Sequence, residues 1–228
     1  MRLKSRVSAV VAALALFGSA PIVATANVAS ASSMASVTVV HGIPGVPVTV
    51  YANGKVLIHK FNYTNVSHTV ELAPGSYALA LRPVGVPETA APILSTKVTL
   101  KSGENATVGA DLNDKGAPVL SVFANPASPA SKKTATVIVR HLAQAPGVDV
   151  YANGTKGSPL VSNLLNGAQA IAHVPAGRYT IAVYAHGSKG HPVIGPAKFK
   201  FVGGKTYVIY AIGSLSLPTG VTAVVQKY

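Results

Sequence analysis

The chain has no cysteine, no tryptophan and only six carboxylate side chains among its 228 residues. Without cysteine it can form neither disulfides nor the lipid-modified cysteine of a lipoprotein, and cysteine-based catalysis is excluded. Glycoside hydrolysis needs two carboxylates that face each other across a cleft, and the six acidic residues are too few and too scattered to indicate such a pair. The Gly-x-Ser-x-Gly elbow of many serine hydrolases is missing as well. We therefore expect a protein that is not an enzyme, with a hydrolase on an unfamiliar scaffold as a remaining alternative.

The most informative feature that is present is an internal repeat. Residues 41–54 (HGIPGVPVTVYANG) return as residues 141–154 (HLAQAPGVDVYANG). Further along, residues 72–81 (LAPGSYALAL) correspond to residues 174–183 (VPAGRYTIAV). Self-similarity at a fixed period indicates tandem copies of one structural unit.

The N-terminus has the layout of a secretory signal peptide. Residues 1–26 combine a cationic start, an apolar run and small residues before a cleavage point, and a second acceptable cleavage point follows residue 31. We expect export and cleavage, with no stable transmembrane segment after processing. The predicted location is secreted or extracellular, in association with the cell wall.

Short β-rich runs alternate with turn signals throughout the rest of the chain, which is typical of an antiparallel sandwich. The Asn-Gly pairs at 53–54 and 153–154 suit tight hairpin turns. We predict an all-β protein of two tandem immunoglobulin-like antiparallel β-sandwich domains, at 36–124 and 134–228, joined by a Pro/Ala/Ser linker at 125–133. Strands of the first domain are expected at 36–41, 46–52, 55–61, 66–72, 76–84, 93–101, 105–112 and 119–124.

Three motifs resemble a known family. They are the opening Val-x-Val-x-His, the Val-x-Val-Tyr-x-Asn-Gly hairpin and the Pro-Ala-Gly-x-Tyr turn. Together they are similar to secreted and cell-surface bacterial domains known only as a domain of unknown function and often found in tandem. The second copy, with Asp149, is the closer match, because the first has Thr49 at that place. The resemblance implies an exported β-sandwich repeat and brings no catalytic residues.

The charge balance is strongly basic. The formal net charge is +13, and the predicted signal peptide carries three of the basic residues. Such a surface attracts anionic cell-wall polymers or acidic polysaccharides, although the charge can also serve solubility alone. Specific nucleic-acid binding is not expected, because the basic residues are scattered and lack interleaved aromatics. A surface protein is a further expected partner.

Five residues are candidates for a binding surface. His41 and His141 recur at the end of the first strand of each copy, where hydrogen bonding to a neighbouring loop is the commoner role. Tyr51 and Tyr151 alternate with valines and would point away from the core, and Tyr63 offers another stacking ring. No cofactor is expected, and no histidine spacing indicates a metal site. Residues 111–116 resemble a calcium loop but have lysine at a ligand position, so they are interpreted as a turn.

These observations lead to one principal hypothesis and two alternatives. The principal one is a non-catalytic exported surface, matrix or adhesion protein. A carbohydrate-binding module is the first alternative, and it requires Tyr51 and Tyr151 to lie exposed and coplanar. The hydrolase is the second, and it requires a histidine and a carboxylate to line one pocket. Association through open sheet edges is also considered, with Lys97, Lys101, Lys198 and Lys200 as charges that guard those edges.

Overall fold

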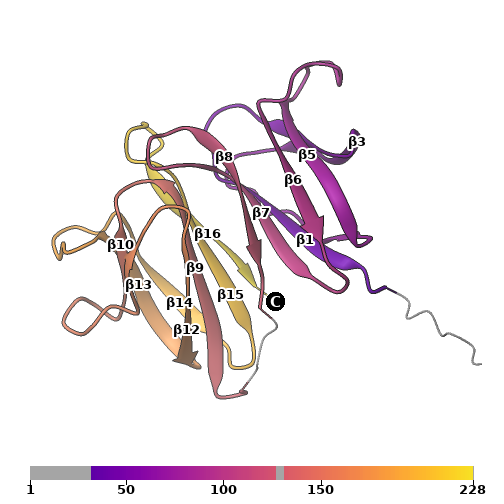
Figure 1. The fold of residues 1–228 in the computed structure, drawn as a ribbon. Helices are drawn as coiled ribbons and strands as arrows, with labels where there is room; N and C mark the ends of the chain where they lie inside the picture. Colours follow the sequence, from indigo (N-terminus) through magenta and orange to yellow (C-terminus); the bar gives the residue numbers. More distant parts are fainter. Residues whose placement is uncertain (1–31, 127–130, 228) are drawn as a thin grey trace, which may run out of the picture. The chain divides into compact units, whose positions relative to one another are not determined.

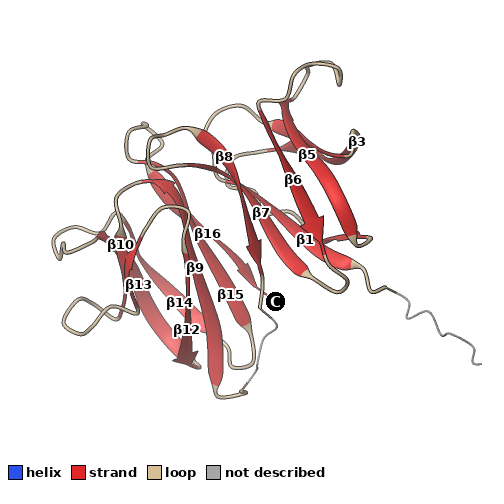
Figure 2. Ribbon diagram, in the orientation of Figure 1, coloured by secondary structure: helices blue, strands red, loops and turns tan. Residues whose placement is uncertain are grey.

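The computed structural model describes residues 32–126 and 131–227, and these residues form strands, turns and loops without a helix (Figure 2). The predicted signal peptide, whether it ends at residue 26 or 31, lies outside the described residues. So do residues 127–130 of the predicted linker. In the described part of the chain no helix is long and apolar enough to cross a membrane.

The described residues form sixteen strands, which follow one another in sequence (Figure 1). The first eight are β1 (Ala35–His41), β2 (Val48–Ala52), β3 (Lys55–Phe61), β4 (Val70–Leu72), β5 (Gly75–Pro83), β6 (Leu94–Leu100), β7 (Asn105–Leu112) and β8 (Pro118–Ala124). The other eight are β9 (Thr134–Gln144), β10 (Val148–Ala152), β11 (Val161–Leu164), β12 (Gln169–Pro175), β13 (Gly177–Ala185), β14 (Ile194–Phe201), β15 (Thr206–Ser214) and β16 (Val221–Lys227).

The strands form four sheets of four strands each, and the two halves of the chain share one strand order. Sheets β4-β1-β7-β8 and β3-β2-β5-β6 make up the first sandwich. Sheets β12-β9-β15-β16 and β11-β10-β13-β14 make up the second sandwich. Because each strand of the first half has a counterpart eight strands later, the all-β architecture of two tandem sandwiches is confirmed.

The strand order differs from the immunoglobulin arrangement, in which a four-stranded and a three-stranded sheet face each other. Here both sheets have four strands, and β1 lies between β4 and β7. The pairing is also not purely antiparallel, since β1 runs parallel to β7 and β9 runs parallel to β15. These strands are buried along almost their whole length, as suits central strands covered on both faces. The repeated motifs predict the strands but do not reveal which distant strands pair.

Two predicted strands are shorter than expected. The predicted strand at 46–52 begins only at Val48, after Pro47, which has no amide proton for the ladder. The predicted strand at 66–72 is regular only from Val70, although Val66 forms an isolated bridge with Val40. Between them the Ser67 hydroxyl accepts a 2.8 Å hydrogen bond from the Val39 amide, so a side chain replaces a ladder bond.

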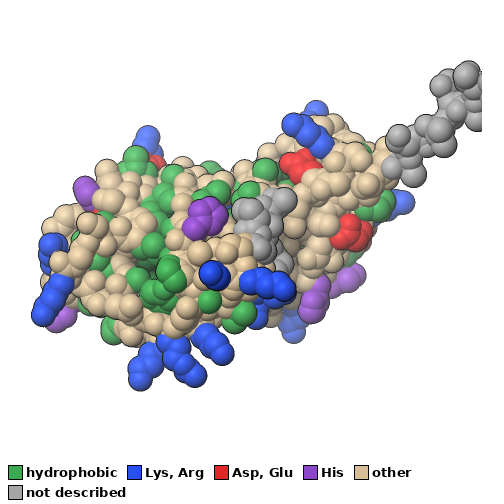
Figure 3. All heavy atoms as spheres, turned by 90° about the horizontal axis from the view of Figure 1, so that it is seen from below, with side chains coloured by type: hydrophobic (Ala, Val, Ile, Leu, Met, Phe, Trp, Pro, Cys, Tyr) green, Lys and Arg blue, Asp and Glu red, His purple; other side chains and the backbone are tan. Residues whose placement is uncertain are grey.

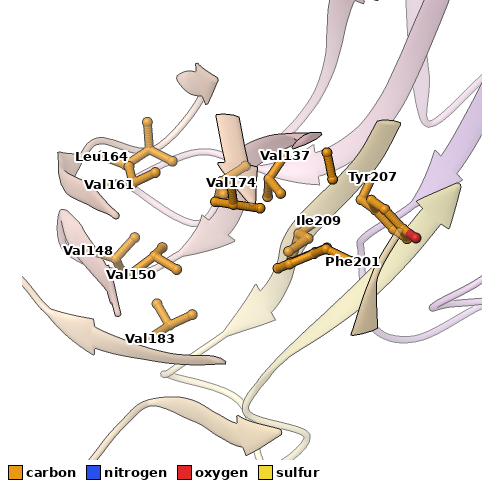
Figure 4. Packing of buried hydrophobic residues seen from close by; sticks show 12 residues of the cluster. Val137, Val148, Val150, Val161, Leu164, Val174, Val183, Phe201, Tyr207 and Ile209 are labelled. Carbon is orange, nitrogen blue, oxygen red and sulfur yellow. The ribbon is translucent and has the colours of Figure 1, made fainter. Parts of the chain in front are cut away.

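Each sandwich has its own hydrophobic core, built by period-two alternation. In the second sandwich, Val148 and Val150 of β10, with Val183 of the neighbouring strand β13, face Val137 of β9 across the interior (Figure 4). Phe199, Phe201 and Tyr207 pack ring to ring at the other end of this core. The first sandwich is filled in the same way by the clusters Ala35, Val37, Ala52, Leu79, Val98, Leu100, Ala106 and Val108, and Val39, Val48, Val50, Phe61, Leu81 and Ala110.

A third buried cluster joins the two sandwiches. Each of the strands β9 and β15 has one face in the inner core of the second sandwich and one face turned outward. Val40 of β1 and Phe123 of β8 pack against residues of this outward face, which are Ile138, Leu142, Val208, Tyr210 and Ile212. This double coverage explains why β9 and β15 are buried along almost their whole length and why β15 is largely apolar. The Asn166 side chain bridges the sandwiches by donating to the carbonyl oxygens of Leu112, at 2.8 Å, and Ala143, at 2.7 Å.

Candidate functional site: the outer face of strands β13 and β14

The two repeated histidines are buried: His41 is the last residue of β1, and His141 lies three residues before the end of β9. His141 is 1% exposed, its Nε2 lies 2.9 Å from the Pro146 carbonyl oxygen, and its Nδ1 accepts a 3.4 Å bond from the Ala143 amide. His41 is 2% exposed, accepts a 3.4 Å bond from the Ile43 amide, and stacks on Phe61. Burial lowers the pKa of both histidines. His141 therefore holds the proline-containing loop that follows it, and neither ring presents a binding surface.

Tyr51 and Tyr151 do point away from the inner core, but other side chains cover them. Tyr51 is 5% exposed, and the Arg82 guanidinium lies 4.8 Å from the centre of its ring. Tyr151 is 4% exposed and meets the edge of Tyr184 at 5.6 Å. The sequence pattern predicted their direction correctly, but the expectation of exposed stacking rings is wrong because side chains from β5 and β13 lie over them.

Tyr63 is half-buried against the cluster between the sandwiches. Its hydroxyl has no hydrogen-bond partner among the described residues, and burial raises its pKa. The five candidates thus lie at separate places, and the structure does not bring them together into one surface.

Asp149 connects strand β11 to the loop that follows β13 in the second sandwich. Its carboxylate accepts hydrogen bonds from the Asn163 amide at 2.8 Å and the Gly187 amide at 3.1 Å, and it contacts His186 Nδ1 at 2.9 Å. Burial alone raises the pKa of Asp149, but these bonds outweigh it and lower the pKa to about 2. The Ser162 hydroxyl donates to the same oxygen that contacts His186, so the histidine does not lie between serine and acid as in a catalytic triad.

Charge is distributed very unevenly between the two sandwiches. Residues 32–126 contain six Lys and Arg residues against five Asp and Glu residues. Residues 134–228 contain a single carboxylate side chain, the buried Asp149, and eight basic residues: Arg140, Lys156, Arg178, Lys189, Lys198, Lys200, Lys205 and Lys227. All of these basic residues except Arg140 are exposed. Figure 3 shows Lys and Arg side chains projecting along the border of the second sandwich.

Three of these cations share the outer face of β13 and β14. Arg178 of β13 lies directly opposite Lys200 of β14, and Thr180 lies opposite Lys198. Together with Asn153 they line an open groove of about 450 Å³, which we call the β13–β14 groove. The Asn153 side-chain oxygen accepts a 2.9 Å bond from the Thr180 amide and so holds the adjacent turn against β13.

The aromatic residues beside the groove belong to the core. Tyr179 and Phe199 also border the groove, but their rings pack on Phe201, at 5.5 Å and 4.9 Å between ring centres. The polar side chains of Arg178, Thr180 and the two lysines therefore determine the chemistry of the groove. Every one of them can donate hydrogen bonds to an anion.

The first sandwich provides a natural comparison for this face. Asn53 accepts a 2.8 Å bond from the Ala78 amide, as Asn153 does from Thr180, so the two faces are equivalent. The places of Arg178 and Lys200 are taken by Ser76 and Thr99, whose hydroxyls share a 3.0 Å hydrogen bond. The arrangement of three cations is therefore particular to the second sandwich.

Sequence reasoning assigned Lys198 and Lys200 only as guards of an open edge. Lys97, Lys198 and Lys200 do lie on the edge strands β6 and β14, and Lys101 directly follows β6. The groove was missed because its residues come from two strands about 20 positions apart. The sequence does contain an indication of a cationic surface in the second half, since no Asp or Glu follows Asp149.

Two sandwiches in series, one of them bearing a cationic groove, define a modular all-β protein. A family model described as a domain of unknown function, DUF4397, matches residues 35–151, which is more than half of the chain. The chain belongs to this family, and the predicted resemblance to a domain of unknown function is confirmed. The match covers the first copy and ends at Tyr151, so the expectation that the second copy is the closer match is not confirmed. No curated protein matches the sequence. Among solved structures it is similar to the Bacillus anthracis TIE protein, with 13% identity and a TM-score of 0.25, covering 84% of this chain and 34% of that chain.

Proposed function

We propose that this protein is a non-catalytic exported binding protein that attaches to an anionic polymer of a cell surface or matrix. The observation that carries the proposal is the charge of the second sandwich, where eight basic residues stand against one carboxylate and that carboxylate is buried. Uncompensated positive charge attracts polyanions and releases their counterions on contact. The signal peptide expected at residues 1–26 supports export.

The roles of the buried polar residues fit a binding protein. His141 holds a loop, and Asp149 holds an amide of β11, a loop amide and a histidine. These are the residues that the hydrolase alternative would require at a pocket, and they serve the local structure instead. The carbohydrate-binding alternative has no support from Tyr51 and Tyr151, because both rings are covered.

Co-sedimentation with purified bacterial cell walls tests this proposal. One batch of walls is left intact, and a matched batch is stripped of its anionic polymers. We expect saturable binding to intact walls at low salt, weak binding to stripped walls, and release at about 0.5 M salt, where charges are screened within a few ångströms. Equal binding to both batches, or no binding at low salt, would contradict the proposal.

A further inference from the structure

We propose that the β13–β14 groove is a phosphate-binding site for a flexible polymer of polyol units joined by phosphodiesters. This inference rests on the proposed function and assigns to it a place and a ligand class. It starts from Arg178 and Lys200, which lie directly opposite each other on neighbouring strands. Like charges in that relationship destabilise a sheet, so an anion between them would relieve an unfavourable contact.

No carboxylate of the described residues neutralises this group. The ion pair found in the described part of the chain joins His186 and Asp149, and the other carboxylates of the protein precede residue 115 in the sequence. Arg178, Lys198 and Lys200 are all exposed. Their charges are therefore directed to solvent and available to a ligand.

The arrangement of donors suits phosphate. A guanidinium donates two parallel hydrogen bonds to phosphate oxygens, and an ammonium group adds a compact charge from the neighbouring strand. Lys198 is two residues from Lys200 on the same face of β14, which separates their backbone positions by about 6.8 Å. Arg178 and Lys200 can thus hold one phosphate while Lys198 reaches the next phosphate of the chain.

The groove also discriminates between classes of polyanion. Single-stranded nucleic acids gain much of their affinity by stacking bases on aromatic rings, and the rings of Tyr179 and Phe199 pack into the core instead. Polyuronates hold each carboxylate on a rigid sugar ring, which fixes the spacing of the charges. A short, flexible polyol lets successive phosphates adjust to the spacing of the three cations.

Calorimetric titration of the purified protein with soluble poly(glycerol phosphate) at low salt tests the site. The variant R178Q/K198Q/K200Q removes the three cations. The control variant K55Q/K97Q/K115Q removes three exposed lysines from the first sandwich and gives the same net charge. Thermal unfolding of both variants checks that they fold.

We expect the groove variant to lose affinity by roughly tenfold or more and the control to lose less than about threefold. Equal losses in the two variants would show that charge acts without a site, which overturns this inference and leaves the proposed function standing. Absence of binding by the unaltered protein would overturn this inference, whereas co-sedimentation with cell walls decides the proposed function separately.

The ligand class and the location have separate tests. Polygalacturonate and oligo(dT) of matched charge are titrated in parallel, and binding of either as tight as poly(glycerol phosphate) would overturn the assignment to polyol phosphates. The variant S76R/T99K recreates the cation row beside Lys97 in the first sandwich. We expect this variant to bind at a second site, and unchanged stoichiometry would count against the assigned geometry.

Discussion

The guanidinium of Arg140 donates a 2.6 Å hydrogen bond to the side-chain oxygen of Asn125, the residue directly after the first sandwich. Arg140 is fully buried, lies 4.5 Å from the centre of the Phe123 ring, and also donates to Gln169 and Tyr210. A buried cation held by amides and rings is stable only while these partners stay in place. Arg140 of the second sandwich thus binds the residue that follows the first sandwich through a hydrogen bond within an apolar cluster.

Replacing this arginine tests the junction. The variant R140A leaves a cavity and removes a hydrogen-bond donor from the buried oxygen of Asn125. We expect the free energy of unfolding to fall by about 3 kcal/mol in urea denaturation. The matched variant K189A, at an exposed loop lysine, should change it by less than about 0.5 kcal/mol. Similar values for the two variants would contradict a role for Arg140 at the junction.

Asp111 makes stability depend on pH near neutrality. It is fully buried on β7, one of its oxygens has no partner among the described residues, and burial raises its pKa to about 7. A raised pKa means that the folded state holds the proton more tightly than the unfolded state does. The contribution to stability is complete below about pH 4 and is lost as the pH rises through about 7.

The variant D111N removes this titration. We expect the stability of D111N relative to wild type to rise between pH 5 and pH 8, because only the wild type titrates at Asp111. The buried histidines His41 and His141, whose lowered pKa values act in the opposite direction, are common to both proteins and cancel in this difference. Chemical denaturation at both pH values measures the difference. Identical pH profiles would contradict the account of Asp111.

Asp149 has the opposite linkage. Its lowered pKa means that its contribution to stability is present above about pH 4 and is lost as the pH falls towards 2. In D149N the Asn163 and Gly187 amides lose their carboxylate acceptor. Hydrogen exchange should therefore accelerate at these two amides at pH 6 and leave the β15 amides unchanged. Unaltered exchange at both amides would refute the anchoring role.

Gly203 is required by close contact rather than by its backbone angles. A Cβ atom there would overlap the carbonyl group of Lys132, so alanine must push the two segments apart. We expect G203A to lower the free energy of unfolding by about 2 kcal/mol, as overpacking does. At Gly157 a Cβ would meet no atom within 4 Å, and G157A should leave stability nearly unchanged. If G203A proves as stable as G157A, the close contact between position 203 and the Lys132 carbonyl group does not constrain the fold.

Much of the fold follows from local sequence signals. The alternation of Val148 and Val150 predicts β10, and the Asn53-Gly54 turn predicts the hairpin of β2 and β3, because period-two burial and left-handed turn residues act over a few positions. The tight hairpin predicted at 153–154 is wrong, since residues 153–160 separate β10 from β11. The parallel pairing of β9 with β15 was not predictable in this way, since the two strands lie about 70 residues apart and share no local motif.

The candidate site was harder to predict than the fold. Alternation correctly turned Tyr151 away from the core, but it cannot show that Tyr184 of another strand covers the ring. Conversely, Arg178 and Lys200 look like isolated basic residues until the register of β13 and β14 places them opposite each other. A site built from residues on two paired strands can be recognised only when the pairing and register of those strands are known.

The salt dependence of polymer binding tests the central claim most directly. The logarithm of the binding constant for poly(glycerol phosphate) is plotted against the logarithm of salt concentration for the wild-type protein and for R178Q/K198Q/K200Q. If Arg178 and Lys200 neutralise one phosphate and Lys198 neutralises the next, the slope for the variant should be shallower by about 1.4. Parallel lines for the two proteins would contradict the claim that the β13–β14 groove holds the polymer.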